Sequence, residues 1–408
     1  MFAGMPPRKK GKVNGGASPE VGGGEDFISA LPDDALLHVL SLLPAEDAVR
    51  TCVLARRWRH LWKSATGLRI GCGAGKEDES PSVHELRHFV NHLLLLRRNG
   101  SSIHTCELRF RGCTCYNDHL CLSLWIRHVV DRGVRFLRLE SQRQELTLDM
   151  PLFSHQLTTL ELNNVHLSNS SDSLSDFPNL QHLEISNTFL EHVEISSKSL
   201  KRLSIRKSCS FIWHTHIRTP NLVSLTLDAH FFSIPVLGSM PSLKEAFVRN
   251  TVDNCGDEGC FSCDYCGLPD GYGYNKNNCF ILQGLSEAEN LTLMSDYKGF
   301  VFHKDLEWCP TFNNLKVLVL DDWFVHRDFY GLDCILKHSP VLEKLTLCLF
   351  LKGTKHKMKM IGKYNQMERP ATISKHLKEI EIKCIVVDEK VYNVSKFLGT
   401  FGIYFLFK

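Results

Sequence analysis

The sequence predicts an α/β protein in which a short N-terminal group of helices is followed by a solenoid of stacked repeats. Two observations support this prediction. The pattern Leu-x-x-Leu-x-Leu, with isoleucine in some copies, recurs along the chain, and the stretch before it carries leucine and tryptophan at helical spacing. The copies begin at Leu157, Leu180, Leu200, Leu222, Leu315, Leu342 and Leu377.

The spacing of these copies indicates the kind of repeat. Equivalent leucines from Leu160 to Leu225 follow one another at steps of 23, 20 and 22 residues, and later steps are 27, 27 and 35. Most of these steps are typical of leucine-rich repeats. Each Leu-x-Leu pair turns two side chains to one face of a short strand, and only a stack of strands can bury that face. Residues 136–370 are therefore predicted to form an irregular leucine-rich-repeat solenoid, with a Cys-rich insertion at 253–279.

The stretch from Phe27 to Leu68 predicts three short helices. Pro32 suits the first helical position, and Pro44 ends that helix after Leu43. A second helix opens directly after Pro44, and a third is expected over residues 56–64, with its two tryptophans on one face. About 40 residues cannot bury enough apolar surface to hold such helices alone. An apolar face without local cover predicts a partner protein.

The sequence of this stretch resembles the motif of a known family. LPDDALLHVLSLLP, followed by AVRTCVLARRWRHLW, resembles the F-box of the large plant family that joins an F-box to leucine-rich repeats and a C-terminal FBD segment. The resemblance implies a three-helix F-box over residues 26–68 that binds a Skp-family adaptor and, through it, a cullin. The adaptor-binding residues, matched by position to the motif, are Leu31, Pro32, Leu36, Leu40, Leu43, Val53, Trp58, Leu61 and Trp62.

The remaining segments complete the predicted domain organisation. Residues 1–25 are rich in Gly, Pro and Lys and are expected to be a disordered basic tail. Residues 69–135 are expected to hold linker helices and the first irregular repeats. Residues 371–408 resemble the opening of the FBD segment, and because the chain stops at Lys408, a truncated FBD segment is expected.

Composition favours an intracellular protein. Lys and Arg number 48 against 45 Asp and Glu, so the net charge of +3 is too small to indicate nucleic-acid binding. Sixteen cysteines in a chain without an apolar signal segment predict reduced thiols. No apolar run reaches the length of a membrane span. We expect the protein in the nucleus, the cytoplasm or both, with no nucleic-acid or membrane partner.

Two patterns have the residue types of metal sites. His84, Glu85 and His88 match H-E-x-x-H, in which two histidines one helical turn apart bind zinc and the glutamate acts as a base. The interpretation we favour is an ordinary amphipathic helix, with a zinc hydrolase as the alternative. The insertion carries four cysteines that could hold a structural zinc, although their spacing is not that of paired zinc knuckles. These cysteines are Cys255, Cys260, Cys263 and Cys266.

The sequence therefore predicts a non-catalytic adaptor without a cofactor. By resemblance, it is the substrate-recognition subunit of an SCF-type cullin-RING ubiquitin ligase, in which the repeats hold a target protein. The alternative is a repeat scaffold that acts outside any ligase. Target binding is expected at outward-facing positions of the repeat strands. These positions are Glu161, Asn163, Glu184, Arg206, Asp228 and Asp321.

Overall fold

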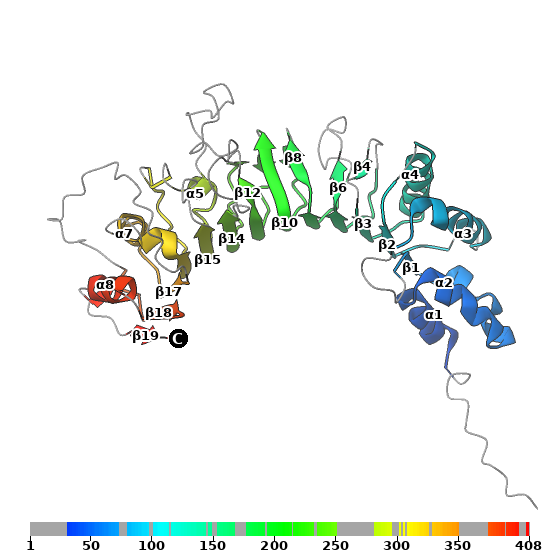
Figure 1. Cartoon of the computed structure of the whole chain (residues 1–408), viewed down its shortest axis with the longest axis horizontal. Coiled ribbons are helices and arrows are strands. Elements are labelled where there is room, and N and C mark those ends of the chain that lie inside the picture. Colours follow the sequence, from blue (N-terminus) through cyan, green and yellow to red (C-terminus); the bar gives the residue numbers. More distant parts are fainter. Residues whose placement is uncertain are drawn as a thin grey trace, which may run out of the picture.

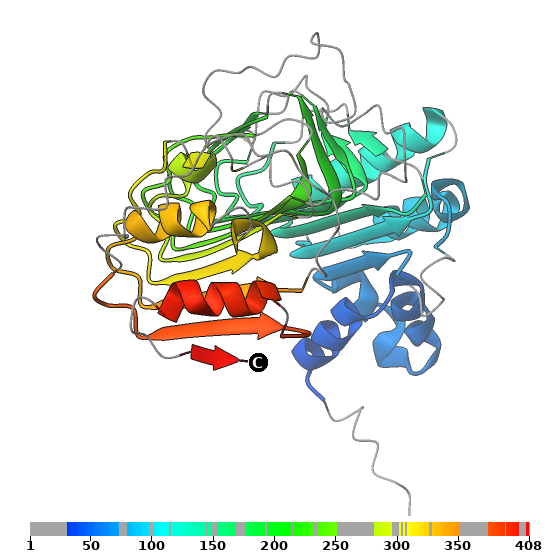
Figure 2. The ribbon, with the colours of Figure 1, turned by 60° about the vertical axis from the view of Figure 1, so that its left-hand side comes forward.

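The computed structural model describes residues 31–72, 80–97, 101–113, 116–143, 146–148, 153–167, 177–191, 194–213, 215–231, 235–250, 281–295, 302, 305–306, 308–325, 329–350, 374–387, 389–399 and 405–407. The described elements form an arch, with a curved sheet along its inner side and helices and short strands along its outer side (Figure 1). The N-terminal helices stand at one end of the arch, and the C-terminal elements stand at the other (Figure 2).

The N-terminal helices are α1 (Asp33–Leu42) and α2 (Ala45–Arg50), followed by three short 3-10 turns. These turns are η1 (Thr51–Val53), η2 (Arg56–Arg59) and η3 (Leu61–Ser64). The predicted third α-helix is thus wrong in detail, because the backbone leaves helical geometry at His60, where φ is −125°. The break still lets Trp58 and Trp62 both point into the interior, where each is buried.

The main sheet holds fourteen strands, and every pairing within it is parallel. Its strands follow chain order, as expected when each repeat adds one strand to the stack. A short strand, β8 (Phe189–Glu191), pairs with the far end of β10. The other strands in order are β1 (Gly67–Ile70), β2 (Thr105–Phe110), β3 (Phe136–Ser141), β5 (Thr159–Asn163), β7 (His182–Ser186), β10 (Arg202–Trp213), β12 (Ser224–Phe231), β14 (Glu245–Asn250), β15 (Asn290–Ser295), β16 (Val317–Asp321), β17 (Lys344–Leu349), β18 (Glu379–Cys384) and β19 (Phe405–Phe407).

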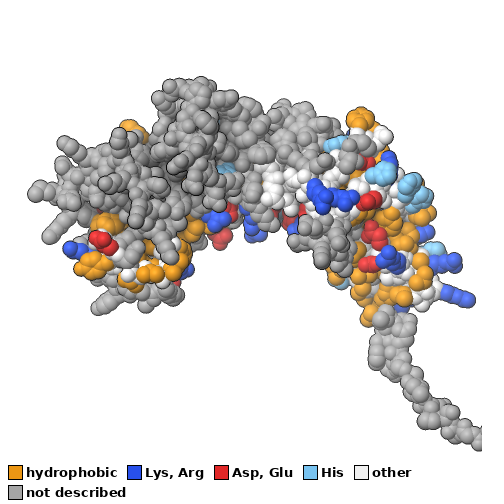
Figure 3. All heavy atoms as spheres, viewed as in Figure 1, with side chains coloured by type: hydrophobic (Ala, Val, Ile, Leu, Met, Phe, Trp, Pro, Cys, Tyr) orange, Lys and Arg blue, Asp and Glu red, His pale blue; other side chains and the backbone are white. Residues whose placement is uncertain are grey.

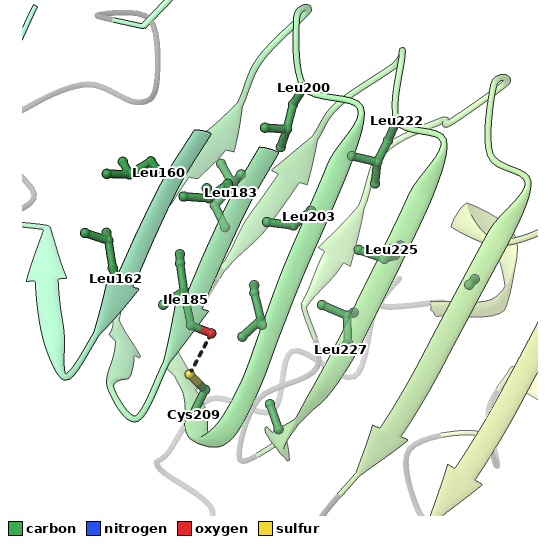
Figure 4. Close-up of a cluster of buried hydrophobic side chains, with 14 of the residues drawn as sticks. Leu160, Leu162, Leu183, Ile185, Leu200, Leu203, Cys209, Leu222, Leu225 and Leu227 are labelled. Atoms are coloured by element: carbon green, nitrogen blue, oxygen red, sulfur yellow. Dashed lines mark hydrogen bonds between the residues drawn. The ribbon is translucent and has the colours of Figure 1, made fainter. Parts of the chain in front are cut away.

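The register of the sheet is the one that the leucine pattern predicts. Leu160, Leu183, Leu203 and Leu225 are Cα partners on successive strands, and all four are buried. Their side chains point to the interior in a single layer (Figure 4). Burial of each such leucine contributes about 1.5–3 kcal/mol, so stacking the strands offsets the cost of ordering them. The structure therefore confirms the strand-rich solenoid.

The outer side of the arch is built from short strands and helices. One small sheet pairs β4 (Leu146–Leu148) with β6 (Val165–Leu167). Another joins β9 (Glu194–Ser196), β11 (His216–Arg218) and β13 (Val236–Leu237). The helical elements are α3 (Val83–Leu96), α4 (Tyr116–Asp131), α5 (Ile281–Gly284), η6 (Asp322–Val325) and α7 (Tyr330–Lys337).

Two asparagines make the sharp turns after neighbouring inner strands. Asn164 and Asn187 have φ angles of 56° and 55°, a left-handed region that asparagine tolerates better than most residues. The Asn164 side chain donates a hydrogen bond to the Ser141 carbonyl at 2.9 Å, and Asn187 donates to Asn163 Oδ1 at 2.6 Å. Each turn is thus tied to the preceding repeat by its own side chain.

The strand β1 joins the N-terminal helices to the sheet. A Cβ atom on Gly67 would lie 2.2 Å from the Ser41 carbonyl oxygen, so only glycine allows this approach of β1 to α1. Arg69 of the same strand donates from Nη1 to the Leu42 carbonyl at 2.7 Å. The sheet therefore begins before residue 136, the start expected from the leucine pattern, and it packs directly on α1.

At the C-terminal end, α8 (Glu389–Gly399) follows β18 and packs on the sheet through buried Val391, Val394 and Leu398. Phe397 of this helix stacks on Phe329, with ring centroids 4.8 Å apart. The next strand, β19, extends the sheet by pairing with β18.

Candidate functional site

The F-box residues predicted to bind the adaptor divide into two groups. Leu36, Leu40, Trp58 and Trp62 are buried in the chain itself, so they hold the helices together. Leu43 and Leu61 are half-buried. Leu31, Pro32 and Val53 are exposed, and Val53 keeps 83% of its surface accessible. The motif thus combines residues of the F-box core with residues that a partner could reach.

Other exposed apolar residues of the F-box were missing from the predicted set. Val39 and Leu42 lie three residues apart on α1, and Leu54 follows Val53 directly after η1. Together, Val39, Leu42, Val53 and Leu54 are called here the F-box apolar surface. Apolar side chains are visible over this end of the molecule in Figure 3. Leucines and valines around most of the circumference of α1 were the sequence signal for them, because such a helix has apolar side chains left over after one face is buried.

The second candidate surface is the concave face, defined as the exposed side of the main sheet. In its N-terminal part, charges of opposite sign alternate from strand to strand. Arg69, Glu107, Arg138 and Glu161 occupy one row in register across β1, β2, β3 and β5. Arg138 Nε donates to Glu161 Oε2 at 2.6 Å, and Arg69 Nη2 lies 3.4 Å from Glu107 Oε2. The charges of this row are thus neutralised within the sheet.

Glu161 also changes the acid–base behaviour of its partner. Burial by itself would lower the pKa of the Arg138 guanidinium, but the hydrogen bond and charge of Glu161 outweigh that effect and raise it. At the other end of the arch, the hydrogen bond from Lys344 to Glu379 raises the pKa of that lysine. Both cations therefore stay charged at any physiological pH.

After Glu184 on β7, the same row has no charged residue until Glu381 on β18. Across β12, β14, β15, β16 and β17, the register aligns Thr226, Phe247, Thr292, Val319 and Thr346. These five residues are called here the uncharged strip. Strands lie about 4.8 Å apart, so the strip spans roughly 20 Å. Phe247 and Val319 are only half-buried, which leaves apolar surface on this part of the concave face.

All six residues predicted to bind the target are half-buried on the concave face. Most of them have partners that can be named in the described part of the chain. Glu161 pairs with Arg138, Glu184 lies 3.9 Å from Arg206, and Asp228 binds Arg249. Asn163 accepts the hydrogen bond from Asn187 described above, and Asp321 ends β16 opposite Cys348 in register. The predicted positions are therefore on the right face, but their charges are largely used between strands.

The H-E-x-x-H match has a structural role in α3. Glu85 Oε2 accepts from the Ser82 backbone N–H at 2.8 Å, and Ser82 Oγ accepts from the Glu85 N–H at 3.2 Å. These two bonds form a capping box that satisfies the start of the helix. The bond from the Ser82 backbone lowers the pKa of Glu85. His84 and His88 are exposed, and among the described residues they belong to no group with metal-binding geometry.

The four candidate zinc ligands of the insertion, Cys255, Cys260, Cys263 and Cys266, lie outside the described residues, as does its fifth cysteine, Cys279. All ten cysteines in the described part of the chain are free thiols. In that same part, the longest helices are too short or too polar to cross a bilayer.

Comparison with known proteins identifies the family. Residues 28–67 match the F-box domain, and residues 122–263 match the family described as "FBD-associated F-box protein At5g56370, LRR repeats". The F-box/LRR-repeat protein At3g59200 of Arabidopsis thaliana is 30% identical over 369 residues, which cover 79% of this chain and 69% of the relative. The chain belongs to the plant F-box/leucine-rich-repeat family.

Other members of the F-box/leucine-rich-repeat family show the same extent of similarity. The Arabidopsis thaliana protein At5g02910, also an F-box/LRR-repeat protein, is 29% identical over 79% of this chain and 72% of its own length. The F-box/FBD/LRR-repeat protein At5g22660 of the same plant is 26% identical over 80% of this chain and 77% of its own. Neither matching family description is that of an enzyme.

Proposed function

We propose that this F-box/leucine-rich-repeat protein is the substrate-recognition subunit of an SCF-type cullin-RING ubiquitin ligase. The observation that carries the proposal is the F-box apolar surface, which remains exposed although the rest of the F-box is packed on β1. Exposed apolar residues grouped on one small domain are typical of a protein-binding site. The family membership supports a Skp-family adaptor as the partner, and through the adaptor a cullin.

In this function the protein is an adaptor without chemistry of its own. Holding a target protein near the ubiquitin-charged enzyme raises the local concentration of the attacking lysine, which is a large kinetic effect without a new catalytic group. The protein needs two binding surfaces for this task. The F-box apolar surface and the concave face would supply them at separate places on the arch. This role places the protein in the nucleus or cytoplasm, where such ligases work.

We further propose that the target binds the concave face around the uncharged strip. Several charged residues on the rest of that face are paired between strands, and separating them would leave carboxylates partly desolvated without partners. Phe247 and Val319 need no such separation, and covering their apolar surface is favourable. Glu161, Glu184, Arg206 and Asp228 would then contribute as pre-formed ion pairs around the contact, together with Asn163 and Asp321.

The adaptor part of the proposal can be tested by pull-down of the full chain with a purified plant Skp-family adaptor. Val53→Glu combined with Leu54→Glu is expected to abolish capture, because both carboxylates would be buried in an apolar interface. Leu95→Glu is the matched control, since Leu95 is 80% exposed on α3, outside the F-box. Unchanged capture by the double variant would refute the proposal. A chain that binds other proteins but no adaptor would instead be a scaffold outside a ligase.

The target part has a separate readout, the set of proteins that the chain contacts in cells. Proteins cross-linked in plant cells to the wild-type chain would be compared with those cross-linked to Phe247→Glu and Val319→Glu chains. We expect both variants to retain the adaptor but lose the same set of partners. Val387→Glu, at an exposed site after β18, is the control. An unchanged partner set in both strip variants would rule out the strip as the contact.

A further inference from the structure

A cluster of metal-binding side chains lies on the outer side of the arch, away from both proposed binding surfaces. The cluster consists of Cys309, before β16, and of Cys334 and His338 at the C-terminal end of α7. The two Sγ atoms and one ring nitrogen of His338 all lie within 4.8 Å of one another. All three residues are half-buried, so an ion from solvent can reach them. No role in the structure described so far requires this combination of residues.

The cluster is held in place by hydrogen bonds between its two chain segments. The Phe312 backbone N–H donates to the His338 carbonyl at 2.8 Å, which ties the segment after Cys309 to the end of α7. Cys334 Sγ donates to the Leu306 carbonyl at 3.3 Å, and Cys309 Sγ donates to the Pro310 carbonyl at 3.7 Å. The three side chains are therefore brought together by the fold before any ion binds.

The orientation of His338 suits metal binding. Its Nδ1 lies 2.8 Å from the Cys334 carbonyl oxygen, and because a carbonyl only accepts, Nδ1 carries the proton. In the neutral ring, Nε2 then keeps the lone pair that a metal needs. A histidine ligand whose other ring N–H is bonded to a backbone carbonyl is the usual arrangement in metal sites.

We propose that Cys309, Cys334 and His338 bind a zinc ion. Two thiolates and one imidazole form a soft donor set that suits zinc, and three protein ligands leave a fourth tetrahedral position for water or another ligand. With Zn–S near 2.3 Å and Zn–N near 2.0 Å, tetrahedral ligand atoms are roughly 3.5–4 Å apart. The observed spacing requires the ligand atoms to move by only about 1 Å.

The surroundings of the cluster are consistent with a bound cation. Asp305, four residues before Cys309, is buried, and its Oδ2 has no hydrogen-bond partner among the described residues. Its other oxygen accepts from the Leu282 N–H at 2.8 Å. The zinc would link α7 to the segment before β16, and would thus fasten one repeat to the next. This inference does not depend on the ligase proposal.

The test must separate this cluster from the cysteines of the insertion. A background chain with Cys255, Cys260, Cys263, Cys266 and Cys279 all changed to Ser removes that competing site. The full-length background chain would be titrated with Co²⁺ and Zn²⁺, and bound metal would be measured by mass spectrometry of the elements. We expect one metal per chain, thiolate-to-cobalt charge-transfer absorption, and a higher melting temperature with zinc.

Adding Cys309→Ser and Cys334→Ser to the background should abolish the charge-transfer band, and His338→Gln should weaken zinc binding at least about tenfold. Cys384→Ser, at another half-buried free thiol, is the matched control and should change nothing. If the double variant fails to fold, as judged by circular dichroism, the single variants and His338→Gln supply the answer. A background chain without the charge-transfer band, or a band that survives loss of both thiols, would overturn the proposal.

Discussion

Arg249 on β14 binds Asp228 on β12 through two parallel hydrogen bonds, from Nε to Oδ1 at 2.7 Å and from Nη2 to Oδ2 at 3.0 Å. This two-point geometry is the strongest that an arginine and a carboxylate can adopt. The pair spans adjacent strands of the concave face beside the uncharged strip. The two charges are therefore already paired with each other in the protein without a target.

A double-mutant cycle measures the coupling energy between Asp228 and Arg249. Asp228→Ala and Arg249→Ala should each lower the free energy of unfolding, with a coupling energy of about 0.5–1 kcal/mol, since both residues keep contact with water. Denaturant unfolding of the two single variants and the double variant gives the value. A coupling near zero would mean that the pair does not persist in solution.

Repeat leucines in the interior should dominate stability. Leu203→Ala, in the buried layer of β10, is expected to lower the free energy of unfolding by about 2–5 kcal/mol, because the neighbouring strands cannot close the cavity. Thr226→Ala, on the opposite face of the sheet, should change it by less than about 1 kcal/mol. Equal effects of the two changes in chemical denaturation would contradict the assigned register.

The F-box residues should separate into those needed for folding and those needed for binding. Trp58→Ala removes a buried indole and should cost about 3–5 kcal/mol of stability. Val53→Ala should leave stability within about 0.5 kcal/mol of the wild type. Adaptor affinity should fall more in Val53→Ala than in Trp58→Ala when each variant is measured at a temperature where it is folded. A strong loss of stability in Val53→Ala would show that Val53 is part of the F-box core.

Buried Asp305 should make stability depend on pH. Burial raises its pKa from 3.8 to about 7, although the N–H groups of Leu282 and Ile281 act against that rise. Because the folded state holds the proton more tightly than the unfolded state, stability is greatest at low pH, falls as pH rises from about 4 to about 7, and then levels off. Asp305→Asn removes this dependence.

The advantage of the Asp305→Asn chain over the wild type should thus grow with pH and reach up to about 4 kcal/mol near pH 8. Melting temperatures of both chains between pH 5 and pH 8, in metal-free buffer, measure it. A constant difference across this range would mean that Asp305 is ionised throughout.

The capping box makes a further prediction about the H-E-x-x-H segment. Ser82→Ala should destabilise the protein by about 0.5–2 kcal/mol, because the Glu85 N–H loses its acceptor. His84→Ala should be neutral, since His84 is exposed. Bound zinc that is lost with His84→Ala would instead revive the hydrolase alternative.

The spacing of the leucines was sufficient to predict the register of the sheet. Some strands were not recognised as repeats, however, because they lack leucine at the repeat position. β2 carries Cys106 and β14 carries Ala246 where other strands carry leucine, and both are in register with their neighbours. Small apolar residues fill the same layer, but a pattern search for leucine does not find them. In the same way, F-box leucines look alike in the sequence, and only the packing of α1 on β1 shows which are buried.

The concave face was predicted to bear the target-binding residues on the basis of strand alternation alone. That reasoning identified which side chains face outward, but it could not show that Glu161 or Asp228 would be paired with arginines. Such pairing depends on which strands lie side by side, and that order is known only from the folded sheet. The metal-binding cluster was missed for a related reason, because Cys309 and Cys334 are 25 positions apart and no short motif joins them.

In the ligase proposed above, the close approach of Gly67 to Ser41 would have a consequence for which lysines of a target are modified. Because β1 is both a strand of the sheet and the support of α1, no linker separates the F-box from the repeats in the described residues. A target held on the concave face would keep one orientation relative to an adaptor on the F-box. The lysines modified would then be those at a fixed position relative to the adaptor on the folded target. Unrelated targets that bind in the same pose would be ubiquitinated at lysines in that same position.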